Sequence, residues 1–218
     1  MTESWTAADY PREHIACLVL AGGRARRMGG INKVLTVLNG RPLIEIAASN
    51  MLPQCAQLLV SANDANDFHT LPWPVIPDLD DTRSGPIAGI LAAMEWCAVN
   101  RPEIGWLLSV PVDCPFLPSD LGSRLWNAAT STNEPLALAA SGGRTHFVSG
   151  LWSVSLRDAI RQQLIGKGVR RAEAIAEACG YATAEWPASP RDPFFNINTP
   201  DDLRAAHLAE NSRLNDRH

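Results

Sequence analysis

The sequence contains short apolar runs in which no polar residue alternates with the apolar ones. Residues 17–20 read CLVL and residues 58–60 read LLV. A strand buried on both faces accepts apolar residues at every position, so these runs are typical of a parallel sheet that is covered on both sides. Segments with helical periodicity separate the runs. This alternation predicts an α/β fold, a doubly wound and mostly parallel sheet with helices on both faces and a ligand at the carboxyl ends of its strands.

The limits of the predicted elements follow from periodicity and from the positions of Gly and Pro. Because no repeat or linker interrupts the series, we expect one domain over residues 14–209, with a flexible leader at 1–13 and a flexible tail at 210–218. The predicted strands are 14–21, 57–62, 74–78, 106–113, 136–140, 146–152 and 182–186, and the predicted helices are 42–51, 86–99, 118–129, 155–164, 172–179 and one that begins at Pro200.

Composition narrows the class of protein. The chain has 218 residues, of which 46% are hydrophobic and 19% charged, as in an ordinary globular domain. Its net charge of −4 argues against nucleic-acid binding, because nucleic-acid-binding proteins present a broad basic face. No apolar run approaches the roughly 18 to 20 residues of a membrane span. The five cysteines are far apart and form no CxxC pair, which indicates reduced thiols and a cytoplasmic protein.

One loop concentrates positive charge. The stretch LAGGRARRMGGINK begins at Leu20 and ends at Lys33, and it combines four glycines with Arg24, Arg26, Arg27 and Lys33. It contains neither GxGxxG nor GxxxxGK[ST], so neither a Rossmann dinucleotide site nor a P-loop is predicted. Glycine N–H groups beside Arg and Lys nevertheless suit an anionic ligand. A flexible surface turn is the alternative interpretation.

Polar residues follow three of the predicted strands. Asp113, in VPVDCPFLP, ends an apolar strand, where its carboxylate suits a Mg²⁺ ion shared with waters and substrate phosphates. A simple turn cap is the alternative there. Asp78 ends a shorter strand, and a solvated acidic loop with Asp80 and Asp81 is its alternative. Asn63 follows a third strand, where an asparagine also commonly forms a turn.

The stretch FFNINTPDDL near the end of the chain has two parts. Thr199, Pro200 and Asp202 match the N-cap, first and third positions of a helix. Asn196 and Asn198 alternate on one predicted strand face, where they present two amides toward a ligand.

These motifs resemble a known family. The pattern LAGGxxxRMGGxxK resembles the signature loop of nucleotidyltransferases, and most closely that of the molybdenum cofactor guanylyltransferases, the MobA family. In that family the loop wraps the nucleoside triphosphate, with its lysine on the phosphates. The resemblance therefore implies GTP contacts by Leu20, Ala21, Gly22, Gly23 and Lys33.

The resemblance extends to the residues at the strand ends. Asn63 matches a family asparagine near guanine, Asp78 a second aspartate that helps to hold the nucleotide, and Asp113 the aspartate that binds magnesium. Related enzymes that use CTP read AAG where this chain reads AGG, so the missing methyl group at Gly22 leaves space for a purine. One methyl group discriminates by only about 1 to 3 kcal/mol, so hydrogen bonds must also select the base.

The resemblance also implies contacts with the second substrate. Asn196 and Asn198 match the family's NxNTP motif, which is tied to substrate binding. Arg170 and Arg171 match its GxRR motif, where basic residues meet the pterin phosphate or a molybdenum-bearing partner. Solvated arginines at a helix entrance are the alternative.

One segment departs from the family pattern. The stretch RTHF is similar to a family segment, but Phe147 stands where many members have proline. Substrate contact by His146 is therefore left open, beside a packed or solvent-facing histidine.

The resemblance implies a Mg²⁺-dependent enzyme that transfers GMP from GTP to the phosphate of a molybdopterin-type cofactor and releases pyrophosphate. Asp113 would bind the metal, and Lys33 and Arg27 would stabilise charge on the leaving group. Molybdenum-insertion and molybdoenzyme maturation proteins are implied as partners. Two alternatives stay open, namely a nucleotidyltransferase of the same fold that uses CTP or a sugar phosphate, and a non-catalytic GTP-binding adaptor for maturation.

Overall fold

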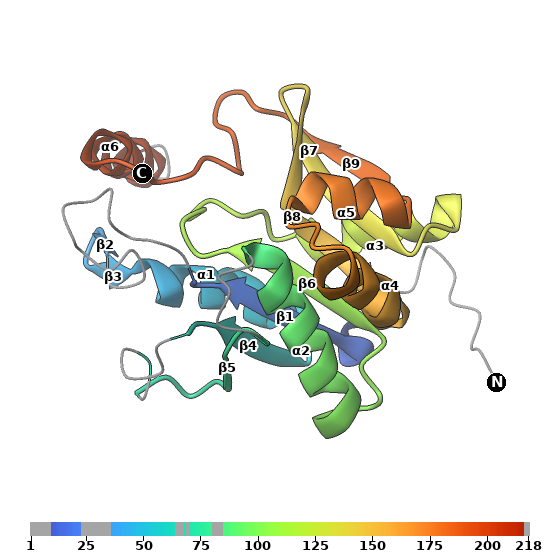
Figure 1. The fold of residues 1–218 in the computed structure, drawn as a ribbon. Helices are drawn as coiled ribbons and strands as arrows, with labels where there is room; N and C mark the ends of the chain where they lie inside the picture. The colour runs from blue at the N-terminus through green and yellow to red at the C-terminus, as the bar shows by residue number, and fades with distance from the viewer. Residues whose placement is uncertain (1–9, 23–35, 64–67, 69, 80–84, 216–218) are drawn as a thin grey trace.

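Strands and helices alternate along the chain, and seven of the strands form one sheet (Figure 1). The computed structural model describes residues 10–22, 36–63, 68, 70–79 and 85–215. The strands are β1 (Ile15–Leu20), β2 (Val37–Leu38), β3 (Arg41–Pro42), β4 (Gln57–Ser61), β5 (Val75–Ile76), β6 (Trp106–Pro111), β7 (Leu136–Ser141), β8 (Arg144–Ser153) and β9 (Ala182–Trp186). The α-helices are α1 (Leu43–Met51), α2 (Pro86–Asn100), α3 (Leu121–Thr132), α4 (Arg157–Arg161), α5 (Ala172–Cys179) and α6 (Pro200–Asn215).

The large sheet has the strand order β5-β4-β1-β6-β8-β7-β9. Every neighbouring pair is parallel except the two pairs that β8 forms with β6 and β7. The prediction of a doubly wound, mostly parallel α/β sheet is therefore confirmed. The antiparallel strand β8 follows β7 through a tight turn, where Gly142 and Gly143 both have positive φ.

Different helices cover the two faces of the sheet. All six residues of β1 are buried. The odd-numbered residues of β1 pack with α1 and α3, and the even-numbered ones pack with α2, α4 and α5. Because both faces of β1 are excluded from solvent, the strand has no polar position. Each fully buried Leu, Val or Ile contributes about 1.5 to 3 kcal/mol to the stability of the fold.

The two edge strands of the sheet differ from the central ones. β5 has only two residues. β9 alternates, with Thr183 and Glu185 exposed between buried neighbours. Short edges and polar edge positions limit pairing with other chains.

Two local elements differ from the predictions. The helix expected over residues 155–164 is instead a 3-10 turn (Val154–Leu156), the short α4 and a wider π-helical turn (Gln162–Gly166). The hairpin of β2 and β3 was not predicted. Its turn contains Asn39 and Gly40 with φ of 47° and 81°, and Asn-Gly favours such turns because both residues tolerate positive φ.

The ends of the described chain extend the predicted domain. The Tyr10 hydroxyl donates a hydrogen bond to the main-chain oxygen of Gln54. At the other end, α6 lies beside the β2–β3 hairpin and continues to Asn215, into the segment predicted as a tail (Figure 1). The limits of the domain stay a prediction. Among the residues described here, no helix is both long and apolar enough to cross a bilayer.

Gly150 lies where β8 passes between β6 and β7, and the sheet leaves no room for a side chain there. A Cβ atom would lie 2.6 Å from Leu138 Cδ2 and 2.8 Å from the carbonyl oxygen of Ala137. We expect Gly150→Ala to lower the free energy of unfolding by about 1 to 3 kcal/mol, because the backbone must shift to accept the methyl group.

The matched control for this substitution is Gly105→Ala, because no atom of the described residues lies within 4 Å of the Cβ position at Gly105. Urea unfolding followed by circular dichroism measures both variants. Equal stability of the two proteins would contradict the close packing at Gly150.

Candidate functional site

Small and polar residues gather where the parallel strands end. Asn63, Asp78 and Asp113 each lie two residues beyond the end of their strand, β4, β5 and β6 respectively. Gly22 lies at the same distance beyond β1. Because β5, β4, β1 and β6 are parallel neighbours in that order, these residues form a row in the order Asp78, Asn63, Gly22 and Asp113. We call this end of the sheet the carboxyl edge, and it is the edge at which doubly wound sheets bind ligands.

Main-chain hydrogen bonds hold the row together beyond the strand ends. The Ala21 N–H donates to the carbonyl of Ser61 at 3.0 Å, and the Val112 N–H donates to the carbonyl of Leu20 at 3.1 Å. The backbone beside Gly22 and the turn before Asp113 are therefore positioned by the sheet itself.

Asn63 and Asp78 form a reciprocal pair. Asn63 Nδ2 donates to Asp78 Oδ2 at 2.9 Å, and the Asp78 N–H donates to Asn63 Oδ1 at 2.9 Å. Helix α2 packs closely against this pair at Gly89. A Cβ atom at that position would lie 2.3 Å from Ser61 Oγ and 3.4 Å from Asp78 Oδ1. The pair sets the orientation of the Asn63 amide, which retains a second N–H donor.

The turn after β6 contacts a segment from the far end of the chain. The Ile197 N–H donates to the carbonyl of Asp113 at 2.9 Å. The Cys114 thiol, which is buried, lies 2.8 Å from Asn196 Oδ1 and 3.5 Å from the carbonyl oxygen of Phe194. Asp113 and Asn196 are thereby brought to the same end of β6.

Asn198 belongs to the start of α6. The N–H groups of Asn198 and Thr199 donate to Asp202 Oδ2 at 2.9 and 2.8 Å, and the Asp202 N–H donates to Thr199 Oγ1 at 3.1 Å. This is the predicted helix cap. The expectation that Asn196 and Asn198 lie on a strand is wrong, because the segment leaves the sheet to connect β9 with α6. Both asparagines are exposed, and burial along the segment does not follow the strict alternation of a strand.

His146 is half-buried on β8, beside the C-terminal half of β7. Its ring stacks on Phe194 with 4.5 Å between the ring centroids. Its Nε2 atom lies 2.8 Å from Ser141 Oγ, and the Ser141 hydroxyl donates to Asp192 Oδ1 at 2.8 Å. Because Ser141 gives its proton to Asp192, Nε2 of His146 is the donor to Ser141. Burial lowers the pKa of His146, and the Asp192 carboxylate opposes this shift. Phe147, at the position of the family proline, packs against the core on the α2 side of the sheet.

The two arginines implied for the second substrate have different surroundings. The main chain at Arg170 lies beside the start of α2, because a Cβ atom at Gly85 would be 3.8 Å from the Arg170 carbonyl oxygen. The Arg171 side chain is 80% exposed and forms an ion pair with Glu173. The fold therefore brings the segment around Arg170 toward α2 and the Asn63–Asp78 pair, whereas Arg171 faces solvent.

Gly23, Arg27 and Lys33 lie outside the described residues, so their contacts stay predictions. Within the described ranges, no group of three or more His, Cys, Asp or Glu side chains is arranged to hold a metal ion. One carboxylate is sufficient for Mg²⁺ when waters and substrate phosphates complete its coordination. The half-buried Asp113 fits that role.

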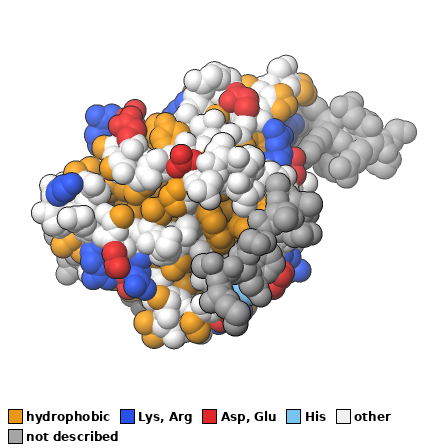
Figure 2. Space-filling view, turned by 90° about the vertical axis from the view of Figure 1, so that its right-hand side faces the viewer, with side chains coloured by type: hydrophobic (Ala, Val, Ile, Leu, Met, Phe, Trp, Pro, Cys, Tyr) orange, Lys and Arg blue, Asp and Glu red, His pale blue; other side chains and the backbone are white. Residues whose placement is uncertain are grey.

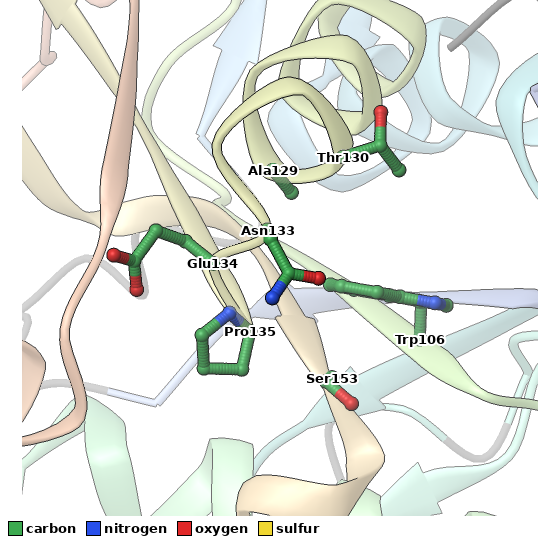
Figure 3. A pocket seen from close by; sticks show the side chains of 7 residues that line it. All are labelled: Trp106, Ala129, Thr130, Asn133, Glu134, Pro135 and Ser153. Carbon is green, nitrogen blue, oxygen red and sulfur yellow. The ribbon is translucent and has the colours of Figure 1, made fainter. Parts of the chain in front are cut away.

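A cavity of about 260 Å³ lies at the opposite edge of the sheet (Figure 3). Figure 2 faces this side of the molecule, on which β1 begins, and shows hydrophobic side chains gathered in the middle with charged ones around them. In Figure 3 the side chain of Glu134 points away from Trp106 and Ser153. The described lining of the cavity contains no basic residue, and the cavity is remote from the carboxyl edge, so it is not the predicted nucleotide site. Its lining residues are Trp106, Ala129, Thr130, Asn133, Glu134, Pro135 and Ser153.

The sequence gives no sign of two further residues near the carboxyl edge, Cys114 and Asp192. The contact between Cys114 and Asn196 joins positions 82 residues apart. Asp192 Oδ1 accepts hydrogen bonds from the Phe194 N–H at 2.9 Å and from Ser141. No periodicity or motif links positions at such separations, so only the fold reveals these contacts.

Comparison with known proteins identifies the family and the fold of this chain. A profile of the MobA-like NTP transferase domain matches residues 17–179. A molybdenum cofactor guanylyltransferase from a Bradyrhizobium species is 44% identical over 207 residues, which cover 94% of this chain and 95% of the relative. A protein of the same name from Rhodopseudomonas palustris is 45% identical over 190 residues, covering 87% of this chain and 89% of the relative.

A solved structure shares the fold. Molybdopterin-guanine dinucleotide biosynthesis protein A from Archaeoglobus fulgidus superposes with a TM-score of 0.71 at 24% identity, over 90% of this chain and 99% of that one. At this identity the likeness shows the common fold alone.

The packed state of His146 predicts a pH-dependent stability. Because burial lowers the pKa of His146 in the folded state, the unfolded chain binds this proton more tightly. The contribution is fully present above the ordinary histidine pKa of about 6.5, and we expect the free energy of unfolding to fall as the pH drops below that value.

The variant His146→Gln tests this assignment, because glutamine keeps an N–H donor but cannot ionise. Urea unfolding of both proteins at about pH 7.5 and about pH 5.5 brackets the titration. We expect the wild type to lose more stability than the variant between the two values. The same loss in both proteins would contradict the role of His146.

Proposed function

The chain belongs to the MobA-like NTP transferase family, and from that premise we propose that it transfers GMP from GTP to the phosphate of molybdopterin. The products are the guanine dinucleotide form of the cofactor and pyrophosphate. Relatives named molybdenum cofactor guanylyltransferase, which align with most of this chain, support the proposal. The structural observation that carries it is the row of Asp78, Asn63, Gly22 and Asp113 along the carboxyl edge, where a sheet of this kind binds nucleotides.

In this proposal GTP lies across the carboxyl edge. Leu20 and Ala21 contact the nucleotide, and the N–H groups of the glycine-rich loop from Gly22 onward hold the triphosphate together with the Lys33 ammonium. Guanine lies near Asn63, whose second amide N–H is a donor for the base carbonyl. Because Asp78 holds the Asn63 amide, that donor is oriented before the base arrives.

The reaction brings together two anions that repel each other. An oxygen of the pterin phosphate attacks the α-phosphorus of GTP while the bond to pyrophosphate breaks. The attacking phosphate is already ionised near neutral pH, so the enzyme needs no general base. Negative charge builds on the departing pyrophosphate, and Lys33, Arg27 and the loop N–H groups stabilise it. The task of the chain is to collect and orient the two substrates.

We infer that Asp113 binds the Mg²⁺ ion used in this reaction. The residue follows a buried strand at the carboxyl edge, and a hard cation takes oxygen ligands from a carboxylate, waters and phosphates. When bound, Mg²⁺ supplies positive charge to the phosphate oxygens.

The second substrate is proposed to bind beside Asp113. Asn196 is held to the same turn through Cys114, and Asn198 follows at the start of α6. Arg170 and Arg171 are the proposed contacts for the pterin phosphate, and the exposed ion pair of Arg171 leaves its guanidinium able to exchange partners.

We place the reaction in the cytoplasm, where the product would pass to molybdenum-insertion and molybdoenzyme maturation proteins. The support for this setting is that the cysteines are present as thiols, as is usual in a reducing compartment.

Incubation of the purified protein with molybdopterin, Mg²⁺ and either GTP or CTP tests the proposed reaction. We expect GTP, and not CTP, to give pyrophosphate and a product with the mass of the guanine dinucleotide. Formation of product from CTP would show that the enzyme uses cytosine and not guanine as its base. Binding of GTP without any product would favour a non-catalytic adaptor.

The matched variant in the same assay is Asp113→Ala. We expect its turnover to fall at least about 100-fold, because the metal loses its protein ligand. The fold should persist, because Ile197 bonds to the main-chain oxygen of Asp113 and not to its side chain. Circular dichroism checks the fold, and near-normal turnover with Mg²⁺ would contradict the metal assignment.

Gly22 offers a separate test of base selection. Among the described residues, a Cβ atom there would meet only the carbonyl oxygen of Ser61, at an ordinary contact distance of 3.8 Å, and Gly22 does not have positive φ. We therefore expect the fold to accept alanine at this position. We expect Gly22→Ala to reduce the preference for GTP over CTP by about 1 to 3 kcal/mol, because the methyl group occupies purine space. The measurement is the ratio of kcat/KM for the two nucleotides, and an unchanged ratio would remove Gly22 from base selection.

A further inference from the structure

The segment 194–198 is attached to the turn after β6 through both backbone and side chain. The Ile197 N–H donates to the Asp113 carbonyl oxygen at 2.9 Å. Next to it, Cys114 Sγ lies 2.8 Å from Asn196 Oδ1. The residue beside the proposed metal ligand therefore touches a side chain proposed to meet the second substrate.

The same segment is held from its other side. Asp192 Oδ1 accepts the Phe194 N–H at 2.9 Å and the Ser141 hydroxyl at 2.8 Å, and His146 stacks on the Phe194 ring. Asp192 and His146 therefore position the backbone that carries Asn196, and the thiol makes only a longer contact with that backbone, 3.5 Å to the Phe194 carbonyl oxygen. What the thiol adds is an interaction with the Asn196 side chain.

A thiol and an amide in contact favour one orientation of the amide. Cys114 is buried, and its S–H group is a donor. Oδ1 accepts that proton, so Nδ2, which branches from the same carbon, lies on the side away from Cys114. Rotation of the amide by half a turn would place its N–H donors against the S–H donor and lose the hydrogen bond. The exposed side chain of Asn196 thus presents two N–H donors at the carboxyl edge.

We propose that Cys114 is a positioning residue that orients the Asn196 amide so that Nδ2 donates to an oxygen acceptor of the pterin substrate. This inference rests on the proposed function, because it assigns the second substrate to Asn196. It gives the buried thiol a role as a hydrogen-bond donor, without any covalent step. Loss of the thiol should therefore weaken binding of the pterin more than it affects GTP or the rate of transfer.

Steady-state kinetics with varied molybdopterin test the proposal on Cys114→Ala and Cys114→Ser. We expect Cys114→Ala to raise the KM for molybdopterin by roughly two- to tenfold, the effect of losing one neutral hydrogen bond. The KM for GTP and kcat should stay close to the wild-type values. Serine retains a donor, so Cys114→Ser should recover most of the loss. A serine variant as impaired as the alanine variant would overturn the donor role.

A double-mutant cycle with Asn196→Ala separates positioning from a general loss of packing. We expect Cys114→Ala to raise the KM for molybdopterin only when Asn196 is present, because the two residues act through one contact. An equal effect in both backgrounds would overturn the proposal. Cys97→Ala is the matched control, because it also removes a buried thiol but lies in the core on the α2 side of the sheet.

A measurement without substrate distinguishes failure of this inference from failure of the proposed function. The side-chain amide signal of Asn196 in a ¹⁵N–¹H spectrum is identified by its absence in Asn196→Ala. We expect it to shift in Cys114→Ala and to stay in place in Cys97→Ala. An unchanged signal in Cys114→Ala would overturn the contact even if transfer is observed. A shifted signal with no transfer activity in the wild type would leave the contact in place and refute the proposed function, and with it the role of the contact in pterin binding.

Discussion

The pairing of β1 with β4 on one side and β6 on the other is the constraint on which the candidate site depends. Parallel pairing aligns the ends of these strands, so the residues that follow them meet at one edge. The strands are buried on both faces and held by main-chain hydrogen bonds as well as by apolar contacts. A rigid row of polar groups therefore forms before any ligand arrives, which lowers the cost of ordering the site on binding.

The second constraint is the attachment of the chain's last segment to that edge. The turn that contains Asp113 and Cys114 bonds to Asn196 and Ile197, while Asp192 and His146 hold the segment through Phe194. The cap at Thr199 then starts α6. The nucleotide end and the proposed acceptor end of the site consequently share one turn, which suits a reaction that must align two phosphates.

Local patterns in the sequence were sufficient for most of the elements. The apolar run of β1 identified a strand that is buried on both faces, and Thr199, Pro200 and Asp202 identified the start of α6. The β2–β3 hairpin was missed, because its two strands have only two residues each and leave no periodic signal. The placement of Asn196 on a strand was wrong because two asparagines that alternate in the sequence do not show that the segment pairs with a neighbouring strand, and this segment instead connects β9 with α6.

By itself the sequence determined most of the strands and helices, because apolar periodicity and helix caps are local properties of the chain. It also placed Asn63, Asp78 and Asp113 at strand ends. Only the tertiary structure decided which strand ends are neighbours and that Cys114 touches Asn196. The physical reason is that these contacts depend on hydrogen-bond pairing and side-chain packing between segments far apart in the sequence. The local sequence around each residue does not specify which distant segment it will contact.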